Sequence, residues 1–123
     1  LGLRELPKFV FFDTGLRAVT KDCIERVERL RAKDPSRADH LDGGMRLATE
    51  EILAGLREYN GSKAPAGDRR SAIERIAAGM ARAGEIYRHW GLVPEEVEGT
   101  LARLASEGVV SPRLTGAGGG GFI

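Results

Sequence analysis

Apolar residues recur at intervals of three or four positions along most of the sequence, and this pattern constrains the fold more than any other feature. Such spacing places the apolar side chains on one face of a helix. Thr20 lies where an N-cap would begin the first repeat, Asn60-Gly61 ends the second, and Gly91 and Gly108 follow the third and fourth. Glycine is common just past helix ends. We therefore predict four amphipathic helices, at about residues 20–33, 41–59, 73–90 and 94–105.

The spacing is different near both ends of the chain. "KFVFFDTG" (8–15) is rich in aromatic and β-branched residues and closes on a turn, as is typical of a strand. "VVSPRLTG" (109–116) has a period of two, and Phe122-Ile123 starts another apolar run after the glycines. We predict an α+β fold in which about four helices cover one face of a small antiparallel sheet. The segregation of helices from strands argues against a Rossmann domain, which needs regular alternation, and no internal repeat is evident.

Composition limits the classes of protein that fit. A chain of 123 residues with 41% hydrophobic content suits one domain. The net charge of +1 gives no electrostatic footprint for nucleic acid or for an acidic membrane surface. One cysteine and the lack of a long apolar run predict a cytoplasmic protein without disulfides. Since the sequence does not begin with Met and stops at Phe122-Ile123, we expect a segment truncated at both ends.

The run Gly116 to Gly121 is broken only by Ala117. Consecutive glycines let successive N–H groups point into one concavity, which holds a phosphate or another loop. The alternative is a glycine-rich hairpin turn or a frayed terminus. The run is neither a dinucleotide-binding fingerprint, because no helix follows it, nor a Walker A loop, because no Gly-Lys-Ser/Thr closes it.

The longer string "PRLTGAGGGGF" (112–122) resembles the third conserved motif of the GHMP kinases, named for galactokinase, homoserine kinase, mevalonate kinase and phosphomevalonate kinase. Arg113, Leu114 and Thr115 match the basic, apolar and hydroxyl positions that precede the glycines in that family. Asp13-Thr14, Thr20-Lys21 and "YRHWGLVPEEVEGTLARL" (87–104) resemble other parts of such kinases in layout. The chain is thus similar to a GHMP kinase C-terminal domain over residues 1–123, and most like the mevalonate kinase branch.

This resemblance implies a ferredoxin-like core and ATP-dependent phosphoryl transfer to a small-molecule alcohol, with Mg²⁺ bridging the phosphates. The residues implied near the ATP phosphates are Thr115, Gly116, Ala117, Gly118, Gly119 and Gly120. Nothing matches the Pro-x-Gly-x-Gly-Leu-Gly-Ser-Ser-Ala loop of the family's N-terminal domain, so we name no catalytic residue and no metal ligand here. The implied partner is that N-terminal ATP-binding domain of the same polypeptide, and the segment alone is expected to be inactive. A homodimer is an assembly that the resemblance also allows.

The acceptor substrate stays open. The unbroken Gly118–Gly121 favours mevalonate and hence isoprenoid precursor synthesis, whereas Phe122 is more typical of sugar kinases of the heptose or fucose type. A third hypothesis, of another class, is a stand-alone domain that binds a ligand or partner without catalysis.

Other residues have two interpretations each. Asp13 and Thr14 either line the acceptor pocket or form an Asx-type turn. Thr20 and Lys21 either contact an anionic acceptor or form an N-cap followed by a solvated lysine. Arg113 forms an ion pair or reaches the ligand. Helical spacing predicts that Trp90 and Cys23 are buried, and His40 and His89 have no partners at metal-ligand spacing.

Overall fold

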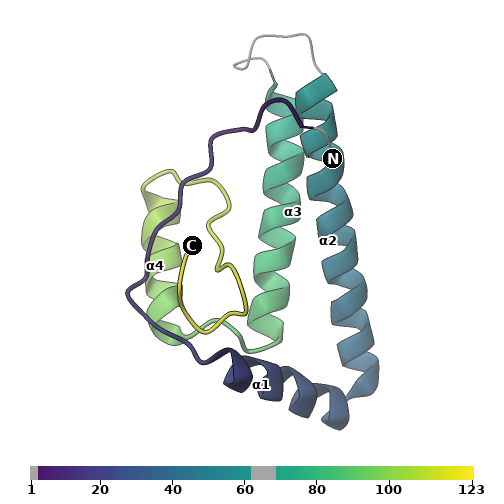
Figure 1. Cartoon of the computed structure of the whole chain (residues 1–123), viewed down its shortest axis with the longest axis vertical. Coiled ribbons are helices and arrows are strands. Elements are labelled where there is room, and N and C mark those ends of the chain that lie inside the picture. The colour runs from purple at the N-terminus through teal and green to yellow at the C-terminus, as the bar shows by residue number, and fades with distance from the viewer. Residues whose placement is uncertain (1–2, 62–68) are drawn as a thin grey trace.

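The computed structural model describes residues 3–61 and 69–123, so most of the predicted loop "GSKAPAGD" (61–68) lies outside the described residues. The four helices are α1 (Thr20–Lys33), α2 (Pro35–Gly61), α3 (Arg70–His89) and α4 (Glu95–Ser106). α2 and α3 form a long antiparallel pair, α1 crosses one end of that pair, and α4 lies apart from it (Figure 1). The prediction of four amphipathic helices is confirmed.

The predicted α+β fold, with its small antiparallel sheet and ferredoxin-like core, is wrong. The described residues are 64% helical and contain no sheet. Their β pairing is a single isolated antiparallel bridge between Asp13 and Phe122. Segment 8–12 is extended but has no hydrogen-bonded neighbouring strand along most of its length. Segment 109–115 is interrupted at Ser111, which has a φ of 51°, and at Pro112, which has no N–H to donate.

Two helix starts also differ from the sequence prediction. Asp34-Pro35-Ser36 does separate α1 from α2, but Pro35 is already the first residue of α2, where its fixed φ is favourable. Thr20 is not an N-cap, because the cap position is Val19 and no side chain caps the helix. The predicted glycine stops are confirmed, since Gly91 and Gly108 follow α3 and α4 with φ of 69° and 91°.

The apolar core has two parts. The first cluster joins α1, α2 and α3 and consists of the buried residues Cys23, Ala38, Leu41, Ile86, Trp90 and Leu92. The second joins α4 to both ends of the chain and consists of Val97, Leu101, Leu104, Leu114 and Ile123. Tyr87 of α3 packs against both clusters. The glycine-rich segment therefore runs through the place where the two parts of the core meet.

The close approach of α2 and α3 depends on an internal repeat that the apolar spacing did not reveal. "ATEEILAG" (48–55) and "AIERIAAG" (72–79) share the pattern A-x-E-x-I-x-A-G. A Cβ added at Gly55 would lie 2.9 Å from the Ala72 carbonyl oxygen, and one added at Gly79 would lie 2.8 Å from that of Ala48. Each glycine thus receives the backbone of the opposite helix, and the two contacts are reciprocal.

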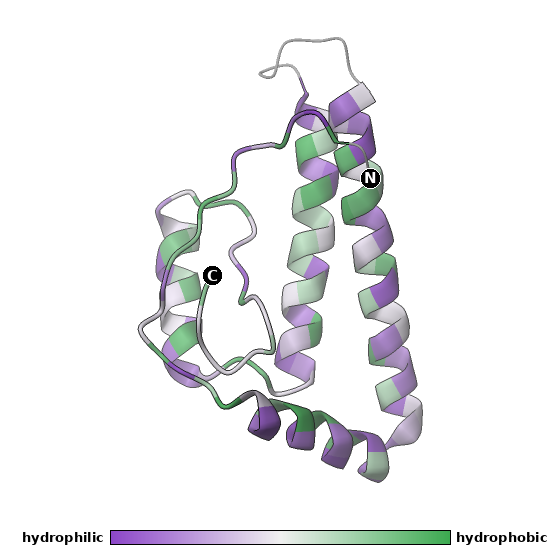
Figure 2. Ribbon diagram, in the orientation of Figure 1, coloured by the Kyte–Doolittle hydropathy of each residue, from purple (hydrophilic) through white to green (hydrophobic). Residues whose placement is uncertain are grey.

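Figure 2 shows that the helices carry mixed apolar and polar surfaces and that apolar residues also lie along the extended segment before α1. Within residues 3–61 and 69–123, no helix combines the length and the apolar character needed to cross a membrane.

Candidate functional site

The glycine loop, residues 115–121, divides into an anchored half and an exposed half. In the anchored half, Gly118, Gly119 and Gly120 have φ of 90°, 74° and 149°, a region that favours glycine. An added Cβ would lie 2.7 Å from Leu92 Cβ at Gly118, and 2.6 Å from Ala18 Cβ at Gly119. These glycines therefore allow the loop to pack directly on the rest of the chain.

Two backbone hydrogen bonds fix this anchored half. The Gly119 N–H donates to the Leu92 carbonyl at 2.7 Å, and the Gly121 N–H donates to the Leu16 carbonyl at 3.1 Å. Leu92 follows α3, whereas Leu16 precedes α1. The loop is consequently held between the first core cluster and the N-terminal segment.

The exposed half begins at Gly116. Gly116 and Ala117 are exposed, and a Cβ at Gly116 would meet no atom within 4 Å. Among the residues that the structure describes, none accepts a hydrogen bond from the N–H of Gly116 or Ala117, whereas Gly118 is buried. Two consecutive donors are thus available next to an anchored support, an arrangement that can hold an anion.

Side chains close the base of the loop. The Tyr87 hydroxyl donates to the Gly116 carbonyl at 2.5 Å, and the Thr115 hydroxyl donates to the Phe122 carbonyl at 2.9 Å. Arg113 lies over the Tyr87 ring, 5.4 Å from its centroid, and its Nε donates to the Leu114 carbonyl. No described residue forms an ion pair with Arg113, so the expected ion pair is not seen.

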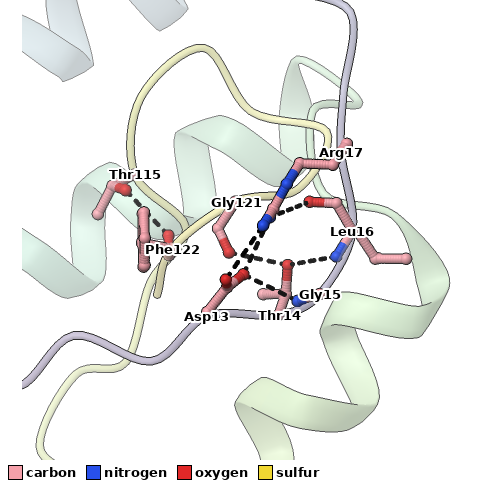
Figure 3. A network of polar contacts seen from close by, with 8 residues as sticks. All are labelled: Asp13, Thr14, Gly15, Leu16, Arg17, Thr115, Gly121 and Phe122. Carbon is pink, nitrogen blue, oxygen red and sulfur yellow. Dashed lines mark hydrogen bonds and ion pairs between the residues drawn. The ribbon is translucent and has the colours of Figure 1, made fainter.

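Asp13 and Thr14 lie against the far end of the same loop (Figure 3). The Thr14 hydroxyl and N–H both donate to the Gly121 carbonyl, each at 2.8 Å. The Gly15 N–H donates to Asp13 Oδ1 at 2.9 Å, which is an Asx-type turn. The structure therefore brings Asp13 and Thr14, the predicted acceptor-pocket residues, next to the predicted glycine loop. Thr14 is half-buried and its hydrogen bonds hold the loop.

Arg17 is the charged residue of this region that sequence reasoning missed. Its Nη1 and Nη2 lie 3.1 Å and 3.2 Å from Asp13 Oδ1 and Oδ2 in a bidentate pair. The hydrogen bond from Arg17, followed by that from Gly15, lowers the pKa of Asp13 below its ordinary 3.8. Asp13 in turn raises the pKa of Arg17. The four-residue spacing of opposite charges was the available signal.

The other candidates lie elsewhere. Lys21 is exposed and pairs with Glu25 at 3.7 Å. Trp90 and Cys23 are buried, as predicted, whereas His40 and His89 are exposed. Across the part of the chain that the structure describes, no three His, Cys, Asp or Glu side chains are grouped to hold a metal ion.

Sequence reasoning also missed the residues that support the loop. Leu16, Ala18 and Leu92 form the surface against which its glycines pack, and the Tyr87 hydroxyl donates to the Gly116 carbonyl. Apolar spacing identifies such residues as core without showing what they contact.

Comparison with known proteins added no relatives: no family model, no curated protein and no solved structure matches this chain. The likeness to GHMP kinases therefore depends on the sequence motifs and stays a prediction.

Proposed function

We propose that this chain is the C-terminal part of an ATP-dependent small-molecule kinase of the GHMP type. The observation that carries the proposal is the pair of available amides at Gly116 and Ala117, held on a support of close-packed glycines. Phosphate oxygens are good acceptors for consecutive backbone N–H groups. The loop is long enough and exposed enough at Ala117 to meet such a ligand.

In this proposal the chain contributes binding and alignment. ATP, when bound, supplies the phosphoryl group, and Mg²⁺ neutralises charge on the phosphates. The amides of the exposed half hold phosphate oxygens, while Tyr87 and the anchored glycines keep those amides in place. The resemblance to GHMP kinases assigns the Mg²⁺ ligands and the proton-transfer groups to the N-terminal domain of the same polypeptide.

Phosphoryl transfer depends mainly on positioning and electrostatic stabilisation, so a rigid backbone loop is a useful component of such a site. Thr14 serves this rigidity through its two bonds to Gly121 rather than by contacting an acceptor. Asp13, whose side chain is 44% exposed beside Arg17, is the member of the pair that we propose to face the acceptor.

The proposed acceptor is mevalonate, because the glycine run is unbroken from Gly118 to Gly121. Phe122 supports a sugar of the heptose or fucose type as the second acceptor to test. The proposed setting is the cytoplasm, where ATP is abundant.

The test is ADP release by the longest natural polypeptide that contains this segment, with ATP and Mg²⁺ and with mevalonate, phosphomevalonate and sugars offered separately. Ala117→Asp places a negative charge beside the available amides, and Ala117→Asn is the matched neutral control. We expect Ala117→Asp to lower kcat/KM for ATP by roughly tenfold or more, with about 1.4 kcal/mol for each tenfold, and Ala117→Asn to stay near wild type.

Equal kcat/KM for the two variants would remove the loop from the phosphate site. A folded polypeptide that releases no ADP with any acceptor would contradict the kinase proposal and favour the non-catalytic binding domain.

A further inference from the structure

A second candidate site lies between the N-terminal half of α2 and the C-terminal half of α3. It is an open groove of about 700 Å³, a size that suits a small molecule. The two helices run antiparallel, so these halves lie side by side (Figure 1). Among the described residues, the lining comes from α2 and α3 alone, and neither the N-terminal segment nor the glycine loop contributes to it.

The groove is basic. Arg37 and Arg46 of α2 and Arg82 of α3 line it together with His40 and His89, and no acidic side chain does so in the described part of the chain. Arginine is always charged in proteins and offers several N–H donors, and a neutral imidazole adds one. The whole chain carries a net charge of only +1, so these basic residues are concentrated here. The groove therefore favours an anion.

The arginines of the groove are weakly paired. Within residues 3–61 and 69–123, Arg37 has no carboxylate partner, and its guanidinium meets a backbone carbonyl at 3.4 Å. Arg46 and Arg82 pair with Glu50 and Glu51 at 3.0 Å and 3.7 Å, but the two arginine side chains are 70% and 50% exposed. Exposed ion pairs contribute little to stability. A bound anion can thus engage these arginines without breaking a strong contact.

Two adjacent glycines of α2 shape the groove in different ways. A Cβ at Gly44 would lie 3.1 Å from Ile86 Cδ1, so this glycine lets α3 come close. A Cβ at Gly43 would meet no atom within 4 Å, although Gly43 lines the groove. Glycine inside a helix is less favourable than alanine, and no close contact at Gly43 offsets that cost. What Gly43 provides is open space beside the basic side chains.

Apolar side chains complete the lining. Leu41 and Ile86 are buried beneath the groove, and Leu47 lines it while remaining exposed. The groove thus offers cationic donors next to a small apolar surface. A matching ligand has an anionic group and a small apolar body.

We propose that this groove binds a small organic phosphate, a phosphate monoester with an apolar body. A phosphate monoester carries close to two negative charges at neutral pH and three strong acceptor oxygens. It can therefore engage several arginines at once, and these charge-assisted hydrogen bonds are stronger than neutral ones. Leu41, Leu47 and Ile86 contact the body of the ligand. The proposal does not depend on the kinase proposal, because neither Gly116 nor Ala117 lines the groove.

The first experiment is a nuclear magnetic resonance titration of the longest natural polypeptide that contains this segment, with phenyl phosphate and, separately, with phenol. Phenol keeps the apolar ring but lacks the phosphate. We expect saturable shifts of the His40, Gly43 and Gly44 amides with phenyl phosphate, and binding roughly tenfold weaker or less with phenol, because the arginines recognise the charge. Equal affinity for the two compounds, or no saturation at millimolar phenyl phosphate, would overturn the proposal.

The same spectra separate this site from the glycine loop. Phenyl phosphate that shifts the Gly116 and Ala117 amides but none in the groove would overturn the groove proposal and leave the proposed phosphate site of the kinase standing. Shifts in the groove that persist in Ala117→Asp support a separate site.

Two variants at Gly43 test the sign of the charge. Gly43→Glu and Gly43→Gln place side chains of the same size in the open space, so both should keep the helical circular dichroism. We expect Gly43→Glu to bind phenyl phosphate roughly tenfold more weakly than Gly43→Gln, because a carboxylate repels the phosphate and pairs with the arginines. Equal affinity in the two variants would contradict an anion site.

Two arginine variants on α2 test the position of the charge. Arg37→Gln removes a charge from the groove, whereas Arg57→Gln removes one from an exposed residue that does not line it. We expect Arg37→Gln to weaken binding roughly tenfold and Arg57→Gln to leave it within about twofold. Equal loss would show that only the overall charge matters, which would overturn the proposal.

Discussion

The α2–α3 pair and the glycine loop both use glycine to bring backbone against backbone, but they do so under different conditions. Gly55 and Gly79 lie inside helices, where their N–H and C=O groups belong to the helical hydrogen-bond pattern. The loop glycines have positive φ and depend on bonds to Leu92, Leu16 and Thr14, which are far away in sequence. The helical pair is thus supported locally, whereas the loop is only as ordered as the segments around it.

The largest expected effect is a loss of stability when the contact between α2 and α3 is disturbed. Gly79→Val would place side-chain atoms where the Ala48 carbonyl and Ile52 already lie, so we expect the free energy of unfolding to fall by about 3 kcal/mol. Gly99→Ala on α4 is the control, because a Cβ there meets no atom within 4 Å. That change should stabilise the chain by about 0.5–1 kcal/mol in urea unfolding. A loss below about 0.5 kcal/mol for Gly79→Val would contradict the close approach.

A smaller effect is expected in the loop. Gly119→Ala combines a φ of 74° with a Cβ only 2.6 Å from Ala18 Cβ, and we expect a local cost of about 2 kcal/mol. Gly121→Ala has a φ of 89° but open space, so its cost should be about 1 kcal/mol. Native-state hydrogen exchange of the Phe12, Thr14 and Ile123 amides reports the local opening of this region.

The same exchange experiment decides whether the two regions are separate cooperative units. If Gly119→Ala raises exchange in α2 and α3 as much as at Phe12 and Thr14, the regions open together and the comparison fails. If α2 and α3 keep their protection, the loop is a distinct and weaker unit.

The smallest effect concerns Asp13, whose pKa is lowered mainly by the hydrogen bond from Arg17. Because the folded pKa lies below the unfolded one, the contribution of the pair is present above the ordinary 3.8 and is lost as pH falls through the lower folded value. Nuclear magnetic resonance titration of the Asp13 carboxyl should show its pKa returning toward 3.8 in Arg17→Met. Arg29→Met is the control and should leave it unchanged. An Asp13 pKa that is the same in wild type and Arg17→Met would exclude Arg17 as the cause.

The helices were predictable because their information is local. Three- and four-residue spacing and glycine stops placed all four, and the buried Trp90 and Cys23 followed from the same pattern. The sheet was wrongly predicted because β propensity in "KFVFFDTG" describes a residue's preference for extended backbone, while a sheet requires neighbours that local sequence does not specify.

The candidate site was predictable in part. The motif identified the glycines, and the turn signal identified Asp13 and Thr14, but neither indicated that Thr14 bonds to Gly121 or that Tyr87 bonds to Gly116. Those contacts join residues 107 and 29 positions apart, respectively, so they depend on how the helices are arranged. Thr20 failed as an N-cap for a similar reason, since a good capping residue does not fix which residue begins the helix.

The pairing of Phe12 with Ile123 has a consequence for biosynthesis. A ribosome makes the chain from its N-terminus, so Phe9, Phe11 and Phe12 leave the exit tunnel long before residues 121–123 exist to bind this segment. α1, α2 and α3 can form in that interval, but the second core cluster cannot close until Ile123 arrives. During synthesis the aromatic N-terminal segment is therefore a ready binding site for chaperones that recognise extended apolar peptides.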